Sequence, residues 1–509
     1  MIESPAAPAA PDLRDRLVSS IPGGTWQGWV GPLLVTLFGA FLRFDRLSVP
    51  HGVVFDETYY VPDAYGILKH GVEISHMRDS DAMLAHGGTH ILVGTAAEYV
   101  AHPPLGKIMI AVGEWLFGLT PFGWRFAAAL VGSVAILMTA RIARRMTRST
   151  WLGCVAGLLL ALDGLEFVLS RTAILDIFLM FWILAAFGLM VLDRDRSRAR
   201  LADALASGRP ANLGFRWPLL LAGLCLGAAC ATKWDGIWYL PVFAFLVLAW
   251  DYGARRAAGT VRPARGVLRS DGPWAGIWFG LAPLAAYVVS WTGWFATSYG
   301  YDRNGTALNG GHPTGTILAW LQYQKSMLGF GLGLRTSHSY QSNPLGWPIL
   351  ARPISFYANC VPPGNQCGQT TRSTEQEVLA IGTPLIWWVA AAALLGCVAW
   401  WIWRRDWQVG AVLAGVAAGW LPWIWFYYHD HRTEFFYYAV VFVPFLVIAI
   451  ALVFDLIRQT FQARITLAVL SGGYLLVVLA NFIYIYPVLA ARVLPYSAWL
   501  SRMWFGNWI

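Results

Sequence analysis

The sequence predicts an all-α polytopic membrane protein with about eleven transmembrane helices. Hydrophobic residues make up 57% of its 509 residues and charged residues only 13%, whereas a typical soluble domain carries about 25% charged residues. Apolar stretches such as Ile174–Leu192 and Val440–Phe454 belong to segments that are long enough for helical spans of about 20 residues. The 28 Trp and 20 Tyr residues are typical of a protein with two membrane interfaces.

The apolar segments, taken in order, predict the spans and their orientation. An odd number of spans places the two termini on opposite sides of the membrane. The short connections 141–150, 193–216 and 251–272 are rich in Arg and are therefore expected in the cytoplasm, with the N-terminus inside and the C-terminus outside. The expected spans are 29–46, 122–143, 151–169, 173–192, 217–233, 236–252, 273–294, 382–403, 407–426, 435–457 and 463–487.

The first part of the chain is expected to form a catalytic transmembrane module. Residues 1–28 lack a signal-peptide cleavage site and are expected to be a disordered cytoplasmic tail. Spans one to seven lie within 29–294, and 47–121 forms the first outer loop. Within this loop, 104–118 is too short for a span, so we expect a helix in the outer interface. Its Lys107 and Glu114 are expected to point toward the headgroups.

The second part is expected to contain a second outer loop and a C-terminal transmembrane module. Residues 295–381 show no 3.6-residue apolar period, which predicts an ordered or semi-ordered loop rather than a further span. Spans eight to eleven lie within 382–509. Cys360 and Cys367 flank a Pro-Pro-Gly turn in this outer loop, and a disulfide between them is expected if the loop faces an oxidising compartment.

A pair of adjacent carboxylates is the strongest candidate for chemistry. Asp56 and Glu57 follow the first span within an apolar and aromatic frame, His51–Tyr60. Such a frame can perturb a carboxylate pKa, and paired acids suit general-base work on a hydroxyl or metal binding. The alternative is an ordinary solvated acid pair. A second candidate element is His102-Pro-Pro-Leu-Gly-Lys107, which could also be no more than a rigid helix start with a snorkelling lysine.

Charged residues inside or at the ends of the spans form the third group of candidates. Charges in a membrane are costly and indicate either a functional site or a buried ion pair that holds helices together. The four lysines of the chain all fall on the expected outer side, against the positive-inside trend, which favours an anionic ligand there. The span charges are Arg43, Arg125, Asp163, Glu166, Arg171, Asp176, Lys233 and Asp235.

Several motifs are absent or are interpreted as structural. The chain has no GxxxxGK[ST] phosphate loop, which argues against an ATP-driven pump. Asp193-Arg-Asp195 looks like the DxD of nucleotide-sugar enzymes, but it lies in an Arg-rich connection and is interpreted as a solvated turn. Any sugar donor is therefore expected to be lipid-linked. His429 and His431 could bind a metal, although interfacial polarity explains them as well.

Together these motifs resemble the protein O-mannosyltransferases, which transfer mannose from polyprenyl-phosphate mannose to protein and have a GT-C fold. The resemblance extends over nearly the whole chain. The interval 295–381 leaves no room for the β-trefoil (MIR) domain of eukaryotic members, so the chain resembles the bacterial, actinobacterial type. The motifs are Arg43, Phe55-Asp-Glu57, His102–Lys107, Trp124-Arg125-Phe126, Ser170-Arg171, Ile174-Leu-Asp176, Thr232-Lys-Trp234, Ser339–Arg352, Arg432 and Phe435–Tyr438.

The resemblance implies a glycosyltransferase in the bacterial cell membrane with its active site on the extracytoplasmic face. Mannose would pass to Ser or Thr of exported proteins by an inverting single displacement, with Asp56 as the general base. Glu57 would position the acceptor, and His102 and Lys107 would shape the site. No cofactor is certain, and a divalent cation is an alternative. The candidates for the phosphate of the donor are Arg43, Arg125, Arg171 and Lys233.

Two other functions compete with this one. A GT-C transferase that glycosylates a lipid would use the same acids, so only the acceptor separates the two enzymes. A transporter or flippase would show charges at the membrane midplane and inverted repeats. The charges of this chain are displaced toward one side and no repeat is evident, which favours an enzyme.

Overall fold

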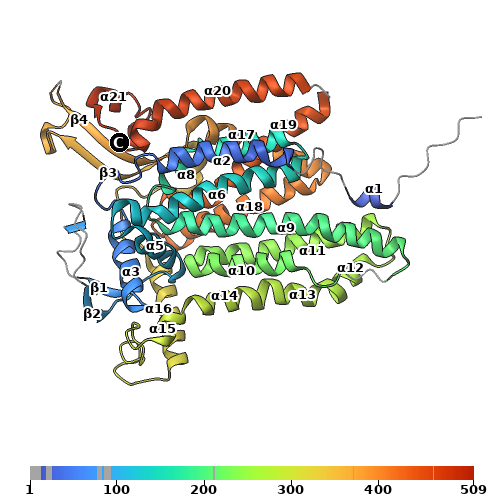
Figure 1. The fold of residues 1–509 in the computed structure, drawn as a ribbon, viewed down its shortest axis with the longest axis horizontal. Coiled ribbons are helices and arrows are strands. Elements are labelled where there is room, and N and C mark those ends of the chain that lie inside the picture. Colours follow the sequence, from blue (N-terminus) through green and yellow to red (C-terminus); the bar gives the residue numbers. More distant parts are fainter. Residues whose placement is uncertain are drawn as a thin grey trace, which may run out of the picture.

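The computed structural model describes residues 13–18, 26–76, 83–84, 93–209, 213–370, 372–461 and 464–509. In this part of the chain, long helices lie side by side in a bundle, while the strands and several short helices gather at one end (Figure 1). Eight described helical segments are long and apolar enough to cross a membrane, judged by length and composition. The predicted class, an all-α polytopic membrane protein, is confirmed. The eight segments are Pro121–Thr147, Leu175–Ala206, Trp234–Ala257, Pro263–Ser290, Pro384–Arg404, Trp407–Asp430, Phe436–Thr460 and Ile465–Leu489.

The three other predicted spans also contain helices. Helix α2 covers Gln27–Phe44, α7 covers Thr150–Ala161 and α10 covers Trp217–Thr232. The exact number of crossings stays a prediction, because α7 and α10 are short. The long helices are α6 (Pro121–Thr147), α9 (Leu175–Ala206), α11 (Tyr239–Ala257), α17 (Pro384–Arg404), α18 (Trp407–Trp425), α19 (Val443–Phe461) and α20 (Arg464–Leu489). The shorter α14 (Ala282–Ser290) forms the last part of the segment Pro263–Ser290.

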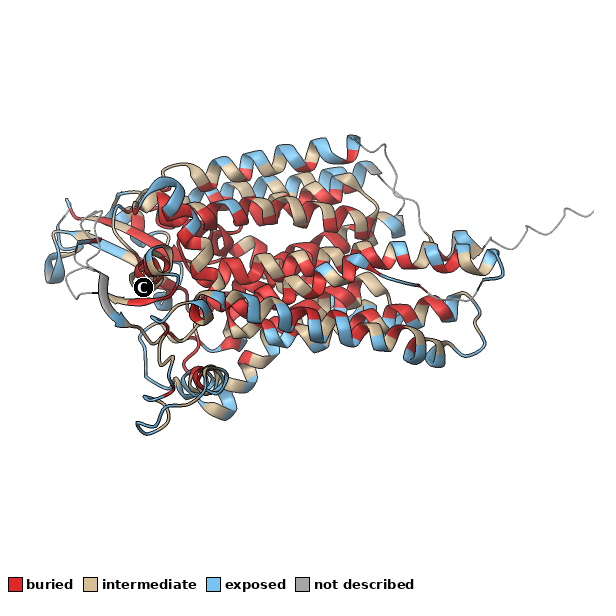
Figure 2. Ribbon diagram, turned by 60° about the horizontal axis from the view of Figure 1, so that its bottom comes forward, coloured by how far each residue is buried: buried red, intermediate tan, exposed pale blue. Residues whose placement is uncertain are grey.

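The bundle is apolar both inside and outside. Its interior is dominated by α6, α7, α9 and α19, whose side chains are largely buried (Figure 2). On the periphery, large apolar side chains are exposed: Phe41 is 68% exposed, Phe245 74% and Leu395 75%. Exposed apolar faces on long helices are what a hydrocarbon environment requires, because the lipid replaces the missing protein partner.

Local capping explains where two helices at the site begin. The Thr120 hydroxyl accepts a hydrogen bond from the Gly123 amide at 3.1 Å, and Pro121 follows as the first residue of α6. Asp163 interrupts the predicted span 151–169 by capping the short helix α8 (Gly164–Leu169) through the Glu166 amide. Both caps satisfy amides that have no partner within their helix.

The first outer region contains more structure than a loop. Helix α3 covers Glu57–His70, the antiparallel strands β1 (Ile74–His76) and β2 (Val93–Ala97) follow, and α5 covers Leu105–Phe117. The expected orientation of α5 is wrong. Lys107 and Glu114 are buried, because α5 packs this face against α3 and α6. Its accessible side chains are apolar, namely Val112, Trp115, Leu116 and Phe117.

The second outer region also differs from the expected loop. Helix α16 (Thr316–Gly333) runs through it and buries Ala319, Tyr323 and Met327, which are four residues apart and lie on one face. This helix escaped prediction because its buried face mixes a small, an aromatic and a flexible residue, while the large aliphatic residues are exposed. The short helix α15 covers Thr292–Ala296.

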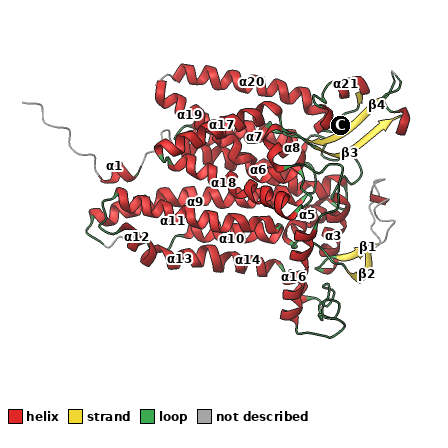
Figure 3. Cartoon of the chain, turned by 180° about the vertical axis from the view of Figure 1, so that it is seen from behind, coloured by secondary structure: helices red, strands yellow, loops and turns green. Residues whose placement is uncertain are grey.

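A three-stranded antiparallel sheet completes the same end of the molecule. It consists of β3 (Ile354–Val361), β4 (Thr374–Ala380) and β5 (Leu494–Pro495), and helix α21 (Tyr496–Leu500) follows it. Cys360, near the end of β3, is joined by a disulfide to Cys367 in the connection between β3 and β4. All labelled strands lie at one end of the bundle (Figure 3).

The other end of the bundle carries α1, the short helix α12 (Pro263–Gly266) and the arginine-rich connections (Figure 1). Helix α1 (Leu13–Leu17) forms within the segment expected to be disordered, because Leu17 is buried against Leu201, Ala202 and Ala254. The rest of the predicted tail, at 1–12 and 19–25, lies outside the described residues. Helix α1 and the C-terminus lie at opposite ends of the bundle.

Candidate active site

Asp56 lies at the start of α3 with its carboxylate available. The residue occupies the N-cap position, yet its side chain makes no capping hydrogen bond. One carboxylate oxygen accepts a hydrogen bond from the Tyr437 hydroxyl at 3.3 Å. Burial raises the pKa of Asp56 to about 6, the charge of Lys233 opposes this shift and Asp176 adds to it. The carboxylate is therefore a base of moderate strength near neutral pH.

The residue before Asp56 has a strained backbone. Phe55 has φ 48°, in the left-handed region that non-glycine residues rarely adopt. Its ring stacks on Phe356 of β3, with 4.6 Å between ring centroids, and contacts Tyr437 edge-on at 5.5 Å. These contacts hold the turn that directs Asp56 toward Tyr437. Strained residues of this kind often occur beside functional groups.

Glu57 is buried and forms a saturated ion pair with Arg125. The Arg125 guanidinium donates to both carboxylate oxygens, each at 2.8 Å, and the amides of Val54 and Ala173 donate at 2.9 Å. Neither side chain is exposed. The pair therefore joins the first outer region to α6 and to the start of α9, and it holds Asp56 in place.

Arg43 and Arg171 make their contacts at the same end of the bundle. Arg43 is buried and paired with Glu166 of α8. The Arg171 guanidinium donates to the backbone carbonyls of Leu42, Arg43, Asp45 and Arg46. The carbonyls of Leu42 and Arg43 lie in the last turn of α2, where carbonyls have no amide partner within the helix. Arg43 thus connects α2 to α8, and Arg171 connects the end of α2 to the residues that follow α8.

Lys233 lies near enough to Asp56 for its positive charge to lower the pKa of that carboxylate. Its ammonium lies 3.0 and 3.2 Å from the two carboxylate oxygens of Asp176 and 3.5 Å from Asp235. It also sits over the Tyr438 ring, 4.1 Å from the centroid, and 5.7 Å from that of Tyr437. The ammonium thus forms ion pairs with both carboxylates.

His102 and Lys107 both pack against α3, the helix that Asp56 precedes. The Lys107 ammonium contacts Glu73 at 2.6 Å and Asp63 at 3.6 Å, and it donates to the His102 carbonyl at 3.1 Å. Burial lowers the pKa of His102, and the charges of Lys233, Lys107 and Arg432 lower it further, so its imidazole is neutral. Lys107 thus holds the His102 backbone in place, while the half-buried imidazole lies 6.2 Å from the Tyr60 ring.

The site also contains residues to which the sequence analysis gave no role. Tyr437 and Tyr438 belong to a 3-10 helix, Phe436–Phe442, that precedes α19. Arg432 is bound by the Gly331 carbonyl at 2.7 Å and by Glu434 at 3.1 Å, and it lies over the Tyr438 ring. The signal in the sequence was the aromatic run after Arg432, which the resemblance listed without giving it a role.

The DxD-like element is not the solvated turn that was expected, because it lies within α9, Asp193 is buried and both acids are ion-paired. Asp193 pairs with Arg216, and Asp195 contacts Arg145 and Arg148 at 2.8 and 3.0 Å. Because both carboxylates are already ion-paired, the DxD-like element has little capacity left to bind a nucleotide. Asp163 accepts a hydrogen bond from the Trp387 indole at 2.7 Å, in addition to capping α8.

The fold and site define a class: a GT-C membrane glycosyltransferase, with a half-buried carboxylate, Asp56, at one end of a helical bundle. The model of the family described as dolichyl-phosphate-mannose-protein mannosyltransferase matches residues 33–258. A second model, the C-terminal four-transmembrane region of protein O-mannosyltransferase, matches 317–508. The chain belongs to the protein O-mannosyltransferase family, as the resemblance predicted.

Individual relatives match this chain over almost its whole length. The chain is 36% identical to the polyprenol-phosphate-mannose–protein mannosyltransferase of Mycolicibacterium smegmatis, over 95% of this chain and 93% of the relative. It is 32% identical to the protein of the same name from Corynebacterium glutamicum, over 93% and 92%. Among solved structures, the Saccharomyces cerevisiae Pmt1-Pmt2 complex bound to the sugar donor has the same fold, with a TM-score of 0.74 at 14% identity, over 97% of this chain and 94% of that chain.

Proposed function

We propose that this enzyme transfers mannose from a polyprenyl-phosphate mannose to Ser or Thr hydroxyls of exported proteins. The names of the relatives support the donor and the protein acceptor. The observation that carries the chemistry is Asp56, a half-buried carboxylate whose pKa is raised to about 6 and whose side chain is not used for capping. It is the base that accepts the hydroxyl proton during the attack on the anomeric carbon.

Tyr437, Tyr438 and Lys233 form the rest of the site around Asp56. Above about pH 6, Asp56 is deprotonated, and the Tyr437 hydroxyl holds one of its oxygens. The other oxygen is left for the acceptor. A single displacement with one base inverts the anomeric configuration, so a β-linked donor gives an α-mannoside. Glu57 acts by positioning Asp56 through the Arg125 pair.

The departing phosphate needs positive charge, and the contacts of the candidate cations favour two of them for this role. Arg43 and Arg125 are already bound in ion pairs, and Arg171 donates its hydrogen bonds to backbone carbonyls. Lys233 lies close to the Asp56 surroundings, and Arg432 adjoins it across the Tyr438 ring. We assign these two residues to the side of the site that meets the phosphate, where fixed cations stabilise the charge that develops.

The site belongs on the extracytoplasmic face of the bacterial cell membrane. The arginine-rich connections lie at the opposite end of the bundle, and such connections favour the cytoplasm. The Cys360–Cys367 disulfide is at the same end as the site, and disulfides persist in oxidising compartments. Both observations point to the same orientation.

The direct test uses the purified chain with a radiolabelled mannosyl polyprenyl phosphate and a Ser/Thr-rich peptide. Label in the peptide is the expected result. Label in a co-reconstituted lipid acceptor, with none in the peptide, would instead favour a lipid glycosyltransferase. Parallel reactions with a chelator and with added divalent cation show whether a metal is needed.

A further inference from the structure

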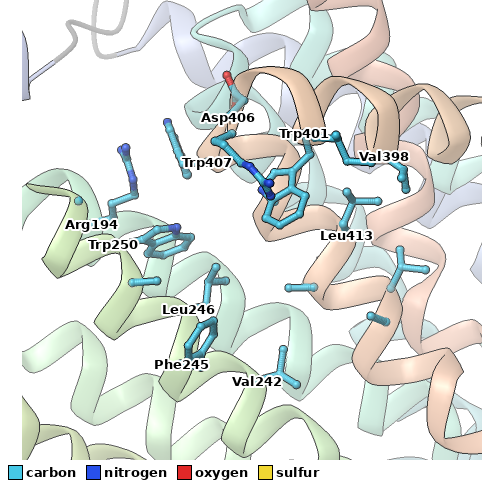
Figure 4. Close-up of a pocket in the computed structure, with 18 of the residues that line it drawn as sticks. Arg194, Val242, Phe245, Leu246, Trp250, Val398, Trp401, Asp406, Trp407 and Leu413 are labelled. Atoms are coloured by element: carbon cyan, nitrogen blue, oxygen red, sulfur yellow. The ribbon is translucent and has the colours of Figure 1, made fainter.

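A large apolar cavity opens at the end of the bundle opposite the candidate active site. It has a volume of about 940 Å³ and lies between α11, α17 and α18, beside the C-terminal half of α9. Figure 4 shows Val242, Phe245, Leu246 and Leu413 on its walls, with Trp250, Trp401 and Trp407 around its polar end. This volume is at the upper end of the range for ligand cavities, about 300–1,000 Å³.

The position of the cavity separates it from the catalytic chemistry. Asp176 at the site and Arg194 at the cavity both belong to α9. They are 18 residues apart, and the helical rise places them about 27 Å from each other, close to the thickness of a hydrocarbon core. The cavity is therefore at the other membrane face.

The cavity is open toward the lipid rather than toward water. Three of its lining residues rank among the exposed large apolar side chains: Phe245 is 74% exposed, Ile402 60% and Leu421 55%. In a bilayer, such positions contact hydrocarbon chains. A lipid tail can thus enter the cavity from the side without crossing a polar boundary.

The polar end of the cavity carries an excess of positive charge. The Arg194 side chain is 7% exposed and stacks on Trp407 at 3.5 Å. Its nearest carboxylate, Asp195 at 3.6 Å, is shared with two further arginines. Arg198 also lines the cavity, and the exposed Arg405 lies over the Trp401 ring at 4.4 Å.

Buried donors at this end lack an acceptor. Among the described residues, the Nε atoms of Arg194 and Arg198 are buried and have no hydrogen-bond partner. Asp406, the acid on the rim, has one oxygen occupied by the amides of Gln408 and Val409. Unsatisfied buried donors are costly, and a phosphate oxygen is the acceptor that suits a guanidinium best.

We propose that this cavity binds an anionic phospholipid, with its phosphate on Arg194, Arg198 and Arg405 and its acyl chains between α11 and α18. A headgroup with net negative charge complements the three arginines, whereas a choline would place a further cation among them. The proposal is independent of the transfer reaction, because none of these residues belongs to the candidate active site.

The test measures lipid retention by the full chain. The protein is taken from nanodiscs that contain equal amounts of phosphatidylglycerol and phosphatidylcholine with the same acyl chains, and bound lipid is counted by native mass spectrometry. We expect phosphatidylglycerol to be retained preferentially. Arg405→Gln or Arg194→Gln should reduce this preference about fivefold for each arginine removed. Ala417→Phe, which fills the cavity wall, should release the lipid while leaving the arginines in place.

Matched controls use arginines next to the cavity that do not line it. Arg404→Gln and Arg196→Gln change exposed arginines that stack on Trp403 and Trp217, and they should retain the lipid. If Arg194→Gln fails to fold, the lipid retention of Arg405→Gln and Ala417→Phe still tests the proposal. Equal retention of the two lipids, or an equal loss of retention in the control variants, would overturn the proposal. Displacement of the bound lipid by added glycerol 3-phosphate, which has no acyl chains, would also overturn it. So would retention of a polyprenyl phosphate alone when it is added to the nanodiscs.

Discussion

At the scale of single residues, the chemistry depends on how Asp56 differs from Glu57 beside it. Both are acids in the same short motif, yet one is half-buried without a salt bridge and the other is saturated by Arg125 and two amides. The sequence predicted the importance of the pair. It could not assign the roles, because two of the three partners of Glu57 lie 68 and 116 residues away along the chain.

The pKa of Asp56 predicts how activity changes with pH. An ordinary aspartate has a pKa of about 3.9, whereas burial raises the pKa of Asp56 to about 6. The base is the deprotonated form, so kcat/KM should be constant above about pH 7 and should fall as the pH drops through 6. The donor is a phosphodiester that does not titrate there, and His102 is held neutral by its lowered pKa. A rate that stays constant from pH 7 to pH 5 would exclude this role for Asp56.

At the scale of elements, buried ion pairs hold the site end of the bundle together. We expect Glu57→Gln to destabilise the protein by about 3–5 kcal/mol, because it leaves the Arg125 charge buried without its partner. The measurement is thermal unfolding of the purified protein in detergent. Asp203→Asn is the matched control, since it removes an exposed ion pair with Arg14 that should contribute at most about 1 kcal/mol.

Equal unfolding temperatures for the two variants would show that the Glu57–Arg125 pair does not hold this region. A loss of stability in Glu57→Gln together with a loss of transfer is the expected combination. The pair positions Asp56, so its disruption should reduce kcat more than it raises KM.

Elements also show where sequence reasoning failed. Lys107 was expected at the headgroups, yet it is buried because Glu73 and Asp63, which precede it by more than 30 residues, supply its charge partners. Helix α16 was missed because its buried Ala319, Tyr323 and Met327 do not form an aliphatic stripe. Long-range pairing and an atypical buried face are both invisible to a hydropathy period.

At the scale of the whole molecule, the architecture followed from hydrophobicity and loop charge. Every predicted span overlaps a helix, because about 20 apolar residues have few alternatives to a helix in a membrane. The arrangement of the outer ends was less predictable. Tyr437 and Lys233 meet near Asp56 only because helices from both halves of the chain converge at one end.

The orientation of the molecule can be tested by accessibility. Ser337 is exposed at the site end, and Ala257 is exposed at the end of α11 that carries the arginine-rich connection. We expect Ser337→Cys to react with a membrane-impermeant maleimide in intact cells, and Ala257→Cys to react only after permeabilisation. The reverse pattern would place the site in the cytoplasm and contradict the proposed orientation.

The central claim is that Asp56 is the base in mannosyl transfer, and Asp56→Asn tests it most directly. The amide has nearly the same shape but cannot accept the hydroxyl proton, so transfer to the peptide should fall by about 100-fold or more. The unfolding temperature should stay close to that of the parent, because Asp56 forms no salt bridge among those the structure describes. A folded Asp56→Asn variant that transfers mannose within a few-fold of the parent rate would contradict the account.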